Sequence, residues 1–402
     1  MVIRNNTPII AIGVKYSFFY PDDNKDMKPY DRNKPHNQLP LLPPPEDKII
    51  DNEILQKWGM ARSALTKLDG ITNTLDDPQI MVNTIVLQEA KESSKIENIV
   101  TTTDGLYQAL ALSATEQRSD AVKQVIRYRE ALMEGINLLK TYGQINKEIV
   151  IRLFQIIKDS TADVRTDLQE VWLSKEGSGA GAGERVYTPP LGNALLNKKL
   201  DNLIDFLNDD EKYKYAPLIK MAIAHYQLEA IHPFIDGNGR TGRVANVLYL
   251  VNKNILKHPI AYFSRYISQN KEDYQYCLKG VTERQAWKPW MLFMLEAVES
   301  TANYTIDKIE QINQQKEKTL AYVNERDSKI DKEYIEAIFI QPYIKALHLS
   351  ENSKYKAKTR KTATSVLNRL VALKVLDPPK KIGREIVYIN STLINILSEN
   401  DE

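Results

Sequence analysis

Residues 232–243 gather side chains that can act together on a phosphate ester. His232 can accept a proton near neutral pH, Asp236 suits a magnesium ion, and two arginines can fork onto phosphate oxygens. The three glycines of the stretch let phosphate oxygens approach main-chain N–H groups without a Cβ in the way. We interpret the stretch as a nucleotide phosphate site with its catalytic base attached.

Two helices must position this stretch. The apolar residues of 216–231 recur at the spacing of a largely buried helix, and those of 244–255 repeat the rhythm. The stretch is therefore a loop that leads into a helix N-terminus. Unpaired N–H groups and the positive end of the helix dipole attract anions there.

Other phosphate-binding loops fit less well. The letters also match G-x-G-x-x-G, but that dinucleotide fingerprint needs a preceding strand and an acidic residue about 20 positions later. Here a helix precedes the loop, and no Asp or Glu lies between Arg243 and Lys271. A Walker loop is excluded because no Gly-Lys-Ser/Thr follows. A plain interhelical turn with Asp236 as its N-cap would not need the flanking histidine and arginines.

The stretch from His232 to Arg243 resembles the signature of the Fic family, His-x-Phe-x-Asp/Glu-Gly-Asn-Gly-Arg-x-x-Arg, and matches every defined position. The resemblance implies transfer of AMP from ATP to a Tyr, Thr or Ser hydroxyl of a protein, with pyrophosphate released. His232 would then be the catalytic base and Asp236 the ligand of Mg²⁺ or Mn²⁺. The ATP phosphates would be held by Gly237, Asn238, Gly239, Arg240, Gly242 and Arg243.

Two further residues near the loop are predicted to be structural. His225 lies on the same helical face as His232, but two histidines alone do not fill a metal coordination shell. We predict that His225 packs in the core. Phe234 is predicted to anchor the loop there as well.

Residues 93–98 resemble the inhibitory motif Ser/Thr-x-x-x-Glu-Gly/Asn of many Fic proteins, with Ser93, Glu97 and Asn98 at its defined positions. The motif precedes the catalytic one, as in the subclass that carries an inhibitory helix on the N-terminal side. The resemblance implies that Glu97 pairs with Arg243 and leaves ATP with its α-phosphate wrongly presented. The alternative is an ordinary i, i+4 pair near a helix end.

The glycine-rich segment 175–184 lies between two stretches of β-favouring residues, which predicts a hairpin with a mobile tip. It resembles the Fic flap, whose edge pairs with the main chain of the target. Arg185, Val186 and Tyr187 are the predicted docking residues. A flexible interdomain linker is the alternative.

Residues 264–267 and 274–278 resemble the family's segment after the core, where two adjacent tyrosines often lean toward the adenine. This chain has Tyr274 followed by glutamine. The predicted adenine side is therefore Tyr274, with Tyr276 as a substitute for the second tyrosine.

The last part of the chain changes character. Residues 331–340, 343–349 and 359–373 are predicted as three helices, and 378–388 as a hairpin around Gly383. That order resembles a winged helix-turn-helix. Residues 354–384 hold ten Lys or Arg and one acidic residue, so Arg360 and Lys361 at the start of the recognition helix are candidate DNA contacts. A dimerisation or substrate-presenting module is the alternative.

The whole chain of 402 residues is long enough for two or three domains. The predicted fold is mainly α: a Fic-type helical core with a small β-hairpin flap, followed by the winged helix-turn-helix. The predicted parts are a proline-rich extended segment (1–48), a helical region with the inhibitory motif (49–110), the catalytic core (111–300), a helical linker (301–330) and the winged helix (331–402).

Composition limits the partners and the compartment. A net charge of +2 implies no polyanion partner for the chain as a whole. One cysteine, Cys277, excludes an internal disulfide and suits a reducing cytosol. The apolar stretch 9–14 is too short for a membrane span or a signal peptide. We therefore expect a soluble cytoplasmic protein without a membrane partner.

The sequence is compatible with three functions. The first is an autoinhibited protein adenylyltransferase that also modifies itself. The second is a hydrolase that removes AMP with a water oriented by Glu97. The third is a DNA-binding regulator that senses nucleotide, which the intact His232 disfavours because binding alone would not require a base.

Overall fold

The computed structural model describes residues 30–75, 78–111, 118–175, 183–351, 359–382 and 385–398. The first 29 residues, the tip of the predicted flap (176–182) and Gly383 of the predicted hairpin lie outside this range. Within it, the predicted mainly helical fold with small antiparallel sheets is confirmed.

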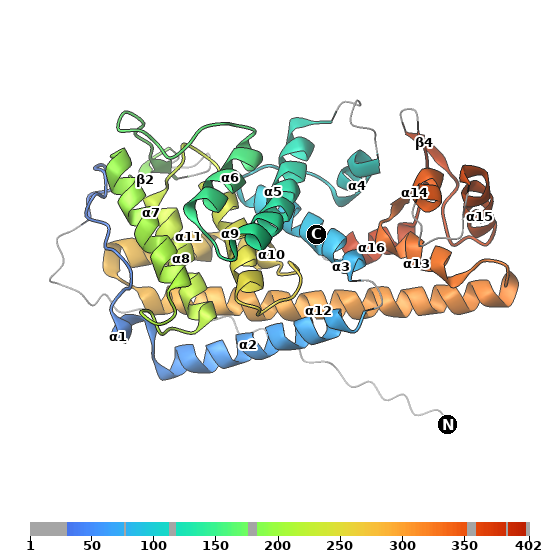
Figure 1. Ribbon diagram of the computed structural model, residues 1–402, viewed down its shortest axis with the longest axis horizontal. Helices are drawn as coiled ribbons and strands as arrows, with labels where there is room; N and C mark the ends of the chain where they lie inside the picture. The colour runs from blue at the N-terminus through green and yellow to red at the C-terminus, as the bar shows by residue number, and fades with distance from the viewer. Residues whose placement is uncertain are drawn as a thin grey trace, which may run out of the picture.

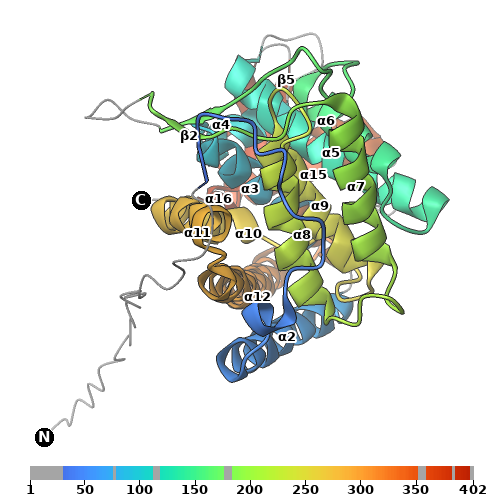
Figure 2. The ribbon, with the colours of Figure 1, turned by 90° about the vertical axis from the view of Figure 1, so that its left-hand side faces the viewer.

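A 40-residue helix, α12 (Trp287–Arg326), runs along one side of the molecule, and α2 (Asn52–Asn73) lies beside it (Figures 1 and 2). The short α1 (Glu46–Ile49) precedes α2. Asp51 caps α2 by accepting a hydrogen bond from the Ile54 N–H, at 2.8 Å. Lys57 of α2 donates to Glu299 of α12 at 2.7 Å. The segment predicted as a helical linker continues α12 rather than forming a separate helix.

Above α12 lie the helices of the core: α5 (Asp120–Tyr142), α6 (Lys147–Lys158), α7 (Asn193–Asn208), α8 (Pro217–Ile231) and α9 (Asn238–Asn252). Helix α8 is buried on nearly every side, as its apolar sequence predicts. Where α5 crosses α9, a Cβ at Gly135 would collide with Leu248. This glycine therefore allows the close packing that holds α9 in place.

Helix α3 (Gln79–Ile96) is fixed between α5 and α10 (Phe263–Gln269) by a buried carboxylate. Glu89 accepts hydrogen bonds from the Tyr128 hydroxyl at 2.9 Å and from the Ser264 backbone N–H at 2.9 Å. Burial raises the pKa of Glu89, and these donors oppose the increase. Helix α4 (Thr103–Ala111) follows α3 and contacts α5, and α11 (Lys271–Arg284) follows α10 and contacts α12.

The flap is a short hairpin of β1 (Leu173–Ser174) and β2 (Arg185–Tyr187), paired antiparallel. The part of the proline-rich N-terminal segment that is described, from residue 30 on, lies against this hairpin, and we call it the strap. The His36 N–H donates to the Thr188 carbonyl at 3.0 Å, and Arg185 donates to the Asn33 carbonyl at 3.2 Å. The strap continues over α8, where Gln227 donates to the Pro40 carbonyl at 2.8 Å.

The C-terminal part folds as α13 (Lys332–Ile340), β3 (Tyr343–Ile344), α14 (Ala346–Glu351), α15 (Arg360–Ala372), β4 (Lys380–Ile382), β5 (Glu385–Ile389) and α16 (Ser391–Ser398). Its three-stranded sheet has the order β3-β5-β4. The first and third predicted helices and the hairpin are confirmed. The helix predicted over 343–349 is wrong in its first part, because Tyr343 and Ile344 pair with β5 as a strand.

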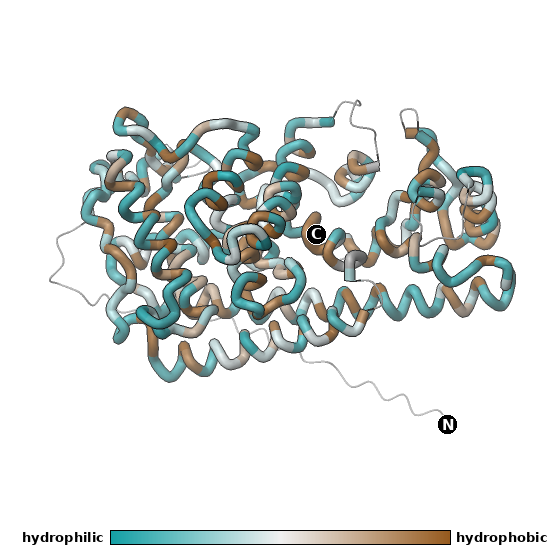
Figure 3. Tube along the Cα trace, viewed as in Figure 1, coloured by the Kyte–Doolittle hydropathy of each residue, from teal (hydrophilic) through white to brown (hydrophobic). Residues whose placement is uncertain are grey.

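The C-terminal part packs on the helix that carries the predicted inhibitory motif. Helix α13 contacts α3, while β3 and α16 contact α4 (Figure 1). The Tyr343 hydroxyl donates to Asp104 of α4 at 2.5 Å. The second half of α12, which leads to this part, is mostly hydrophilic (Figure 3). No helix among the described residues is long and apolar enough to cross a membrane.

Candidate active site

The loop between α8 and α9 is shaped by two residues with left-handed backbones. His232 ends α8 with φ of 48°, and Gly237 precedes α9 with φ of 81°. Phe234 is buried, as predicted, and stacks on Phe154 with ring centres 4.1 Å apart. The Asn238 side chain closes the loop by accepting from the Phe234 N–H and donating to the Phe234 carbonyl, both at 2.9 Å. The side-chain amide of Asn238 is therefore engaged within the loop itself.

Arg165 connects the loop after α8 to the base of the flap, and the sequence analysis did not identify it. Its buried guanidinium donates to three carbonyls: that of His232 at 2.9 Å, that of Gln169 at 2.8 Å and that of Pro190 at 3.0 Å. Its backbone N–H donates to the Pro233 carbonyl at 2.9 Å. A lone arginine in an irregular segment gives no sequence signal for such a role.

The environment of His232 keeps its imidazole neutral. Burial lowers the pKa of His232 to about 4, and the charge of Arg165 adds to the decrease, while Glu97 and Asp236 oppose it. At neutral pH the ring therefore carries a free lone pair, as a general base requires.

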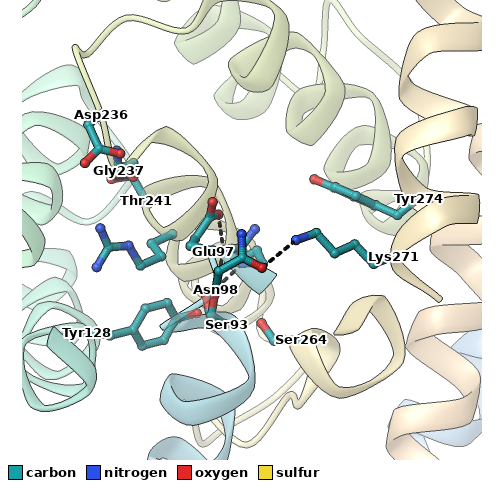
Figure 4. Close-up of polar contacts among 12 residues, drawn as sticks. Ser93, Glu97, Asn98, Tyr128, Asp236, Gly237, Thr241, Ser264, Lys271 and Tyr274 are labelled. Carbon is teal, nitrogen blue, oxygen red and sulfur yellow. Dashed lines mark hydrogen bonds and ion pairs between the residues drawn. The ribbon is translucent and has the colours of Figure 1, made fainter. Parts of the chain in front are cut away.

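Arg243 is held by α3. Its side chain is 1% exposed. Its Nε donates to Ser93 Oγ at 2.8 Å, and its Nη2 donates to the Ser93 carbonyl at 2.9 Å and to Glu97 Oε1 at 2.8 Å (Figure 4). The structure thus brings Ser93 and Glu97 of the predicted inhibitory motif into hydrogen-bond distance of Arg243.

Glu97 lies just after the last turn of α3, and its carboxylate reaches the first turn of α9. A Cβ at Gly239 would lie 2.5 Å from Glu97 Oε1 and 2.9 Å from Arg243 Nη1, so only glycine allows this approach. Burial alone would raise the pKa of Glu97, but the charge of Arg243 and its hydrogen bond outweigh burial and lower it. The Glu97 side chain is 37% exposed. Next to it, Asn98 has φ of 60° and accepts from Lys271 at 3.4 Å.

Asp236 stands at the mouth of the loop, with its side chain 65% exposed. Its Oδ1 accepts the Gly237 N–H at 2.6 Å, and its Oδ2 pairs with Lys158 at the end of α6. No cluster of three or more metal-ligating side chains occurs within the described ranges. The site nevertheless fits Mg²⁺, which proteins often hold through one carboxylate together with substrate phosphates and water.

The two arginines of the loop contact different helices. Whereas Arg243 bonds to α3, Arg240 donates from Nη1 to Gln124 of α5 at 3.0 Å and is buried. Gly242, predicted to line phosphates, is a packing position. A Cβ there would lie 3.1 Å from Glu229 Oε1 and 3.3 Å from His225 Nδ1.

His225 is buried in the core, as predicted. Its Nε2 is 2.9 Å from the Tyr274 hydroxyl, and its ring stacks on Trp290. Tyr274 is 5% exposed, whereas Tyr276 is exposed and lies under the guanidinium of Arg284. The two predicted adenine-side tyrosines thus lie in different surroundings and are not brought together.

Of the predicted docking residues of the flap, Tyr187 is buried, whereas Arg185 and Val186 are only half-buried. The Tyr187 hydroxyl donates to the Ala230 carbonyl at 2.7 Å and is buried, which ties β2 to α8 just before His232. The Arg185 guanidinium lies 4.5 Å from the centre of the Trp172 ring. Val186, which lies between Arg185 and Tyr187 in the sequence, is half-buried.

A helical core, a phosphate-type loop at a helix N-terminus and a histidine at its entrance define a protein of the Fic fold class. Residues 55–137 match the model described as Fic/DOC family N-terminal, and 123–250 match that described as Fic/DOC family. Residues 316–393 match the model described as Protein adenylyltransferase SoFic-like, C-terminal domain. The chain belongs to the Fic family.

Curated relatives carry related names. The chain is 42% identical over 55 residues to "Protein adenylyltransferase fic-1" of Caenorhabditis elegans, covering 14% of this chain and 11% of that protein. It is 29% identical over 201 residues to "Protein adenylyltransferase Fic" of Drosophila willistoni, covering 49% and 37%. The matches therefore span well under half of the length of these relatives.

A solved structure supports the fold alone. The crystal structure of a Fic family protein from Desulfovibrio desulfuricans matches with a TM-score of 0.54 at 17% identity, covering 85% of this chain and 96% of that chain.

Proposed function

We propose that the protein is an autoinhibited protein adenylyltransferase, which transfers AMP from ATP to a Tyr, Thr or Ser hydroxyl of a target protein and of itself. The observation that carries this proposal is the placement of Arg243, which lies in the second turn of α9 and is held by Ser93 and Glu97. The names of the curated relatives support the same reaction.

The chemistry follows from the loop. The neutral imidazole of His232 accepts the proton of the target hydroxyl as its oxygen attacks the α-phosphorus. The bond from the α-phosphorus to the bridging oxygen breaks, and pyrophosphate leaves. The backbone N–H groups at the start of α9 and the charge of Arg243 stabilise the charge on the phosphate oxygens. Mg²⁺ or Mn²⁺ bound at Asp236 would neutralise charge on the phosphates.

Inhibition results from competition between Glu97 and the γ-phosphate of ATP for the Arg243 guanidinium. While Glu97 accepts from Arg243, the γ-phosphate cannot form the same bond, and ATP is presented with its α-phosphate misplaced for attack. Because Glu97 is partly exposed, the contact lies within reach of an entering ligand. Most molecules are therefore inactive at rest, but the contact between Glu97 and Arg243 can still be broken.

We further propose that the target docks by strand addition along the flap. Arg185, Val186 and Tyr187 form its second strand, and the Tyr187 anchor to Ala230 fixes that strand near the base. Main-chain pairing would give the target register with little demand on its side chains. We place this reaction in the cytoplasm, which suits the single buried thiol of Cys277.

The test is mass spectrometry of the purified protein after incubation with ATP and Mg²⁺ or Mn²⁺. Glu97→Gly should gain AMP, and the double variant with His232→Ala should gain none. If purified AMP-modified protein instead loses AMP in a Glu97-dependent reaction, while no variant gains it, the hydrolase replaces the transferase.

A second candidate function concerns the C-terminal part, which we interpret as a winged helix. Arg360 and Lys361 are exposed in the first turn of α15. Lys361, Thr364, Ser365 and Asn368 line an open hollow on the same helix. A basic and polar helix face without acidic groups favours contact with DNA phosphates. If the protein does not shift random duplex DNA even at low salt, the module serves dimerisation or substrate presentation.

A further inference from the structure

We propose that Lys158 occupies, in the resting protein, the position of the divalent cation at Asp236, so that a metal ion can bind only by displacing this ammonium group. The inference rests on the metal role of Asp236 in the proposed function. It concerns a residue outside the signature loop, on a different helix.

The contacts place the Lys158 ammonium directly on the carboxylate. Its Nζ pairs with Asp236 Oδ2, while the Gly237 N–H holds Oδ1 at 2.6 Å and fixes the rotamer of the carboxylate. The lysine stem packs against the loop. A Cβ at Gly237 would lie 3.1 Å from both Cγ and Cδ of Lys158. The glycine thus leaves room for the lysine as well as supplying the left-handed backbone.

The end of α6 keeps Lys158 in this place. Lys158 is the last residue of the helix, and Asp159 follows in a left-handed conformation with φ of 51°. Asp159 pairs with Arg127 of α5, which joins the end of α6 to the neighbouring helix. The Lys158 side chain is only 29% exposed although its partner is 65% exposed. The ammonium is therefore directed at the carboxylate rather than into solvent.

A divalent metal ion and the Lys158 ammonium group cannot both bind Asp236 without electrostatic repulsion between them. Mg²⁺ requires near-octahedral oxygen ligands at about 2.0–2.1 Å, and Lys158 offers no oxygen and carries a like charge. The lysine satisfies Asp236 in the absence of the metal, as Glu97 satisfies Arg243 in the absence of the phosphate. Figure 4 shows Asp236 and Glu97 near the same end of α9. The resting site is thus neutralised at both positions by the charges of the protein itself.

The test measures metal binding directly, without nucleotide, from the electron paramagnetic resonance signal of free Mn²⁺. Lys158→Met should lower the Kd for Mn²⁺ by about tenfold, because a positive charge about 5 Å from a divalent ion opposes its binding even in a water-like dielectric. Lys158→Arg, which keeps the charge, should bind as weakly as the unmodified protein. In Lys158→Met/Asp236→Asn the gain should disappear.

Lys147→Met is the matched control. Lys147 lies on the same helix, is also 29% exposed, and pairs with Asp201 at 2.8 Å, away from the loop. An unchanged Kd in Lys158→Met, or an equal decrease in Lys147→Met, would overturn the inference. Because the titration contains no ATP and no target, a failure of adenylyl transfer in every variant would refute the proposed function and leave this result to stand separately.

Discussion

Replacing Glu97 with glycine tests the brake with the least disturbance of the fold. Glu97 follows the last helical residue of α3, so glycine there interrupts no helix. The change removes the carboxylate from Arg243 but leaves the two bonds of the guanidinium to Ser93. We therefore expect Arg243 to keep its position and to become available to the γ-phosphate.

The magnitude follows from the contact that is lost. A hydrogen bond to a charged group contributes about 1.5–3 kcal/mol when it is shielded from water. Since the Glu97 side chain is 37% exposed, we take a value of about 2 kcal/mol, which corresponds to about 30-fold in an equilibrium constant. Automodification should therefore be about 30-fold faster in Glu97→Gly than in the unmodified protein.

The assay is the initial rate of incorporation of label from α-³²P ATP. Glu97→Gln, which loses the charge but can still accept from Arg243, should give an intermediate rate, and Glu97→Gly/His232→Ala should give none. If the rate in Glu97→Gly stays within about threefold of the unmodified protein, the pair with Arg243 does not restrain the reaction at the magnitude argued from hydrogen-bond energies.

Further predictions concern the base, the loop and the C-terminal part. Because the pKa of His232 is lowered to about 4, the base stays unprotonated well below pH 6.5. In Glu97→Gly, kcat/KM should be flat from pH 8 to about 5.5, whereas a fall centred near pH 6.5 would contradict this. Arg165→Met removes a charge that lowers this pKa, so the acid limb should move to higher pH and kcat should fall more than KM changes. If the acid limb of the pH profile stays at the same pH in Arg165→Met, the role of Arg165 is purely structural. Phe234→Ala should lower the free energy of unfolding by about 3–5 kcal/mol, measured by urea denaturation, since its ring is buried on Phe154; a loss below about 1 kcal/mol would show that the ring does not anchor the loop. Lys361→Glu should weaken the shift of duplex DNA and reduce its salt dependence, and an unchanged shift would remove α15 from the interface.

The sequence predicted the parts of the site that depend on local pattern. His232, Asp236 and Arg243 lie within one short loop between two strongly periodic helices, so their proximity needs no tertiary information. Glu97 was linked to Arg243 only by resemblance, and the contact of Ser93 with Arg243 was not predicted, because contacts between residues about 150 positions apart are determined by packing. The structure brings these residues into hydrogen-bond distance.

What the sequence could not supply was the assignment of polar groups to partners. Asn238 and Gly242 belong to the phosphate-type motif, yet one closes the loop on Phe234 and the other makes room for α8. Lys158 and Arg165 carry no motif, because their roles come from helix ends and carbonyls that meet only in the fold. In the C-terminal part, β3 escaped prediction since two residues are too few to show a strand pattern.

Helix α3, which ends just before Glu97, also packs against the C-terminal part, because α13 contacts α3 and the Tyr343 hydroxyl donates to Asp104 of the following helix. Because α3 contacts both parts of the protein, ligand binding at the C-terminal part and nucleotide binding at Arg243 would be thermodynamically linked. Under the proposed function, a ligand that binds the C-terminal part more tightly when Glu97 is released from Arg243 would promote nucleotide binding at Arg243. Nucleotide must then raise the affinity for that ligand by the same factor.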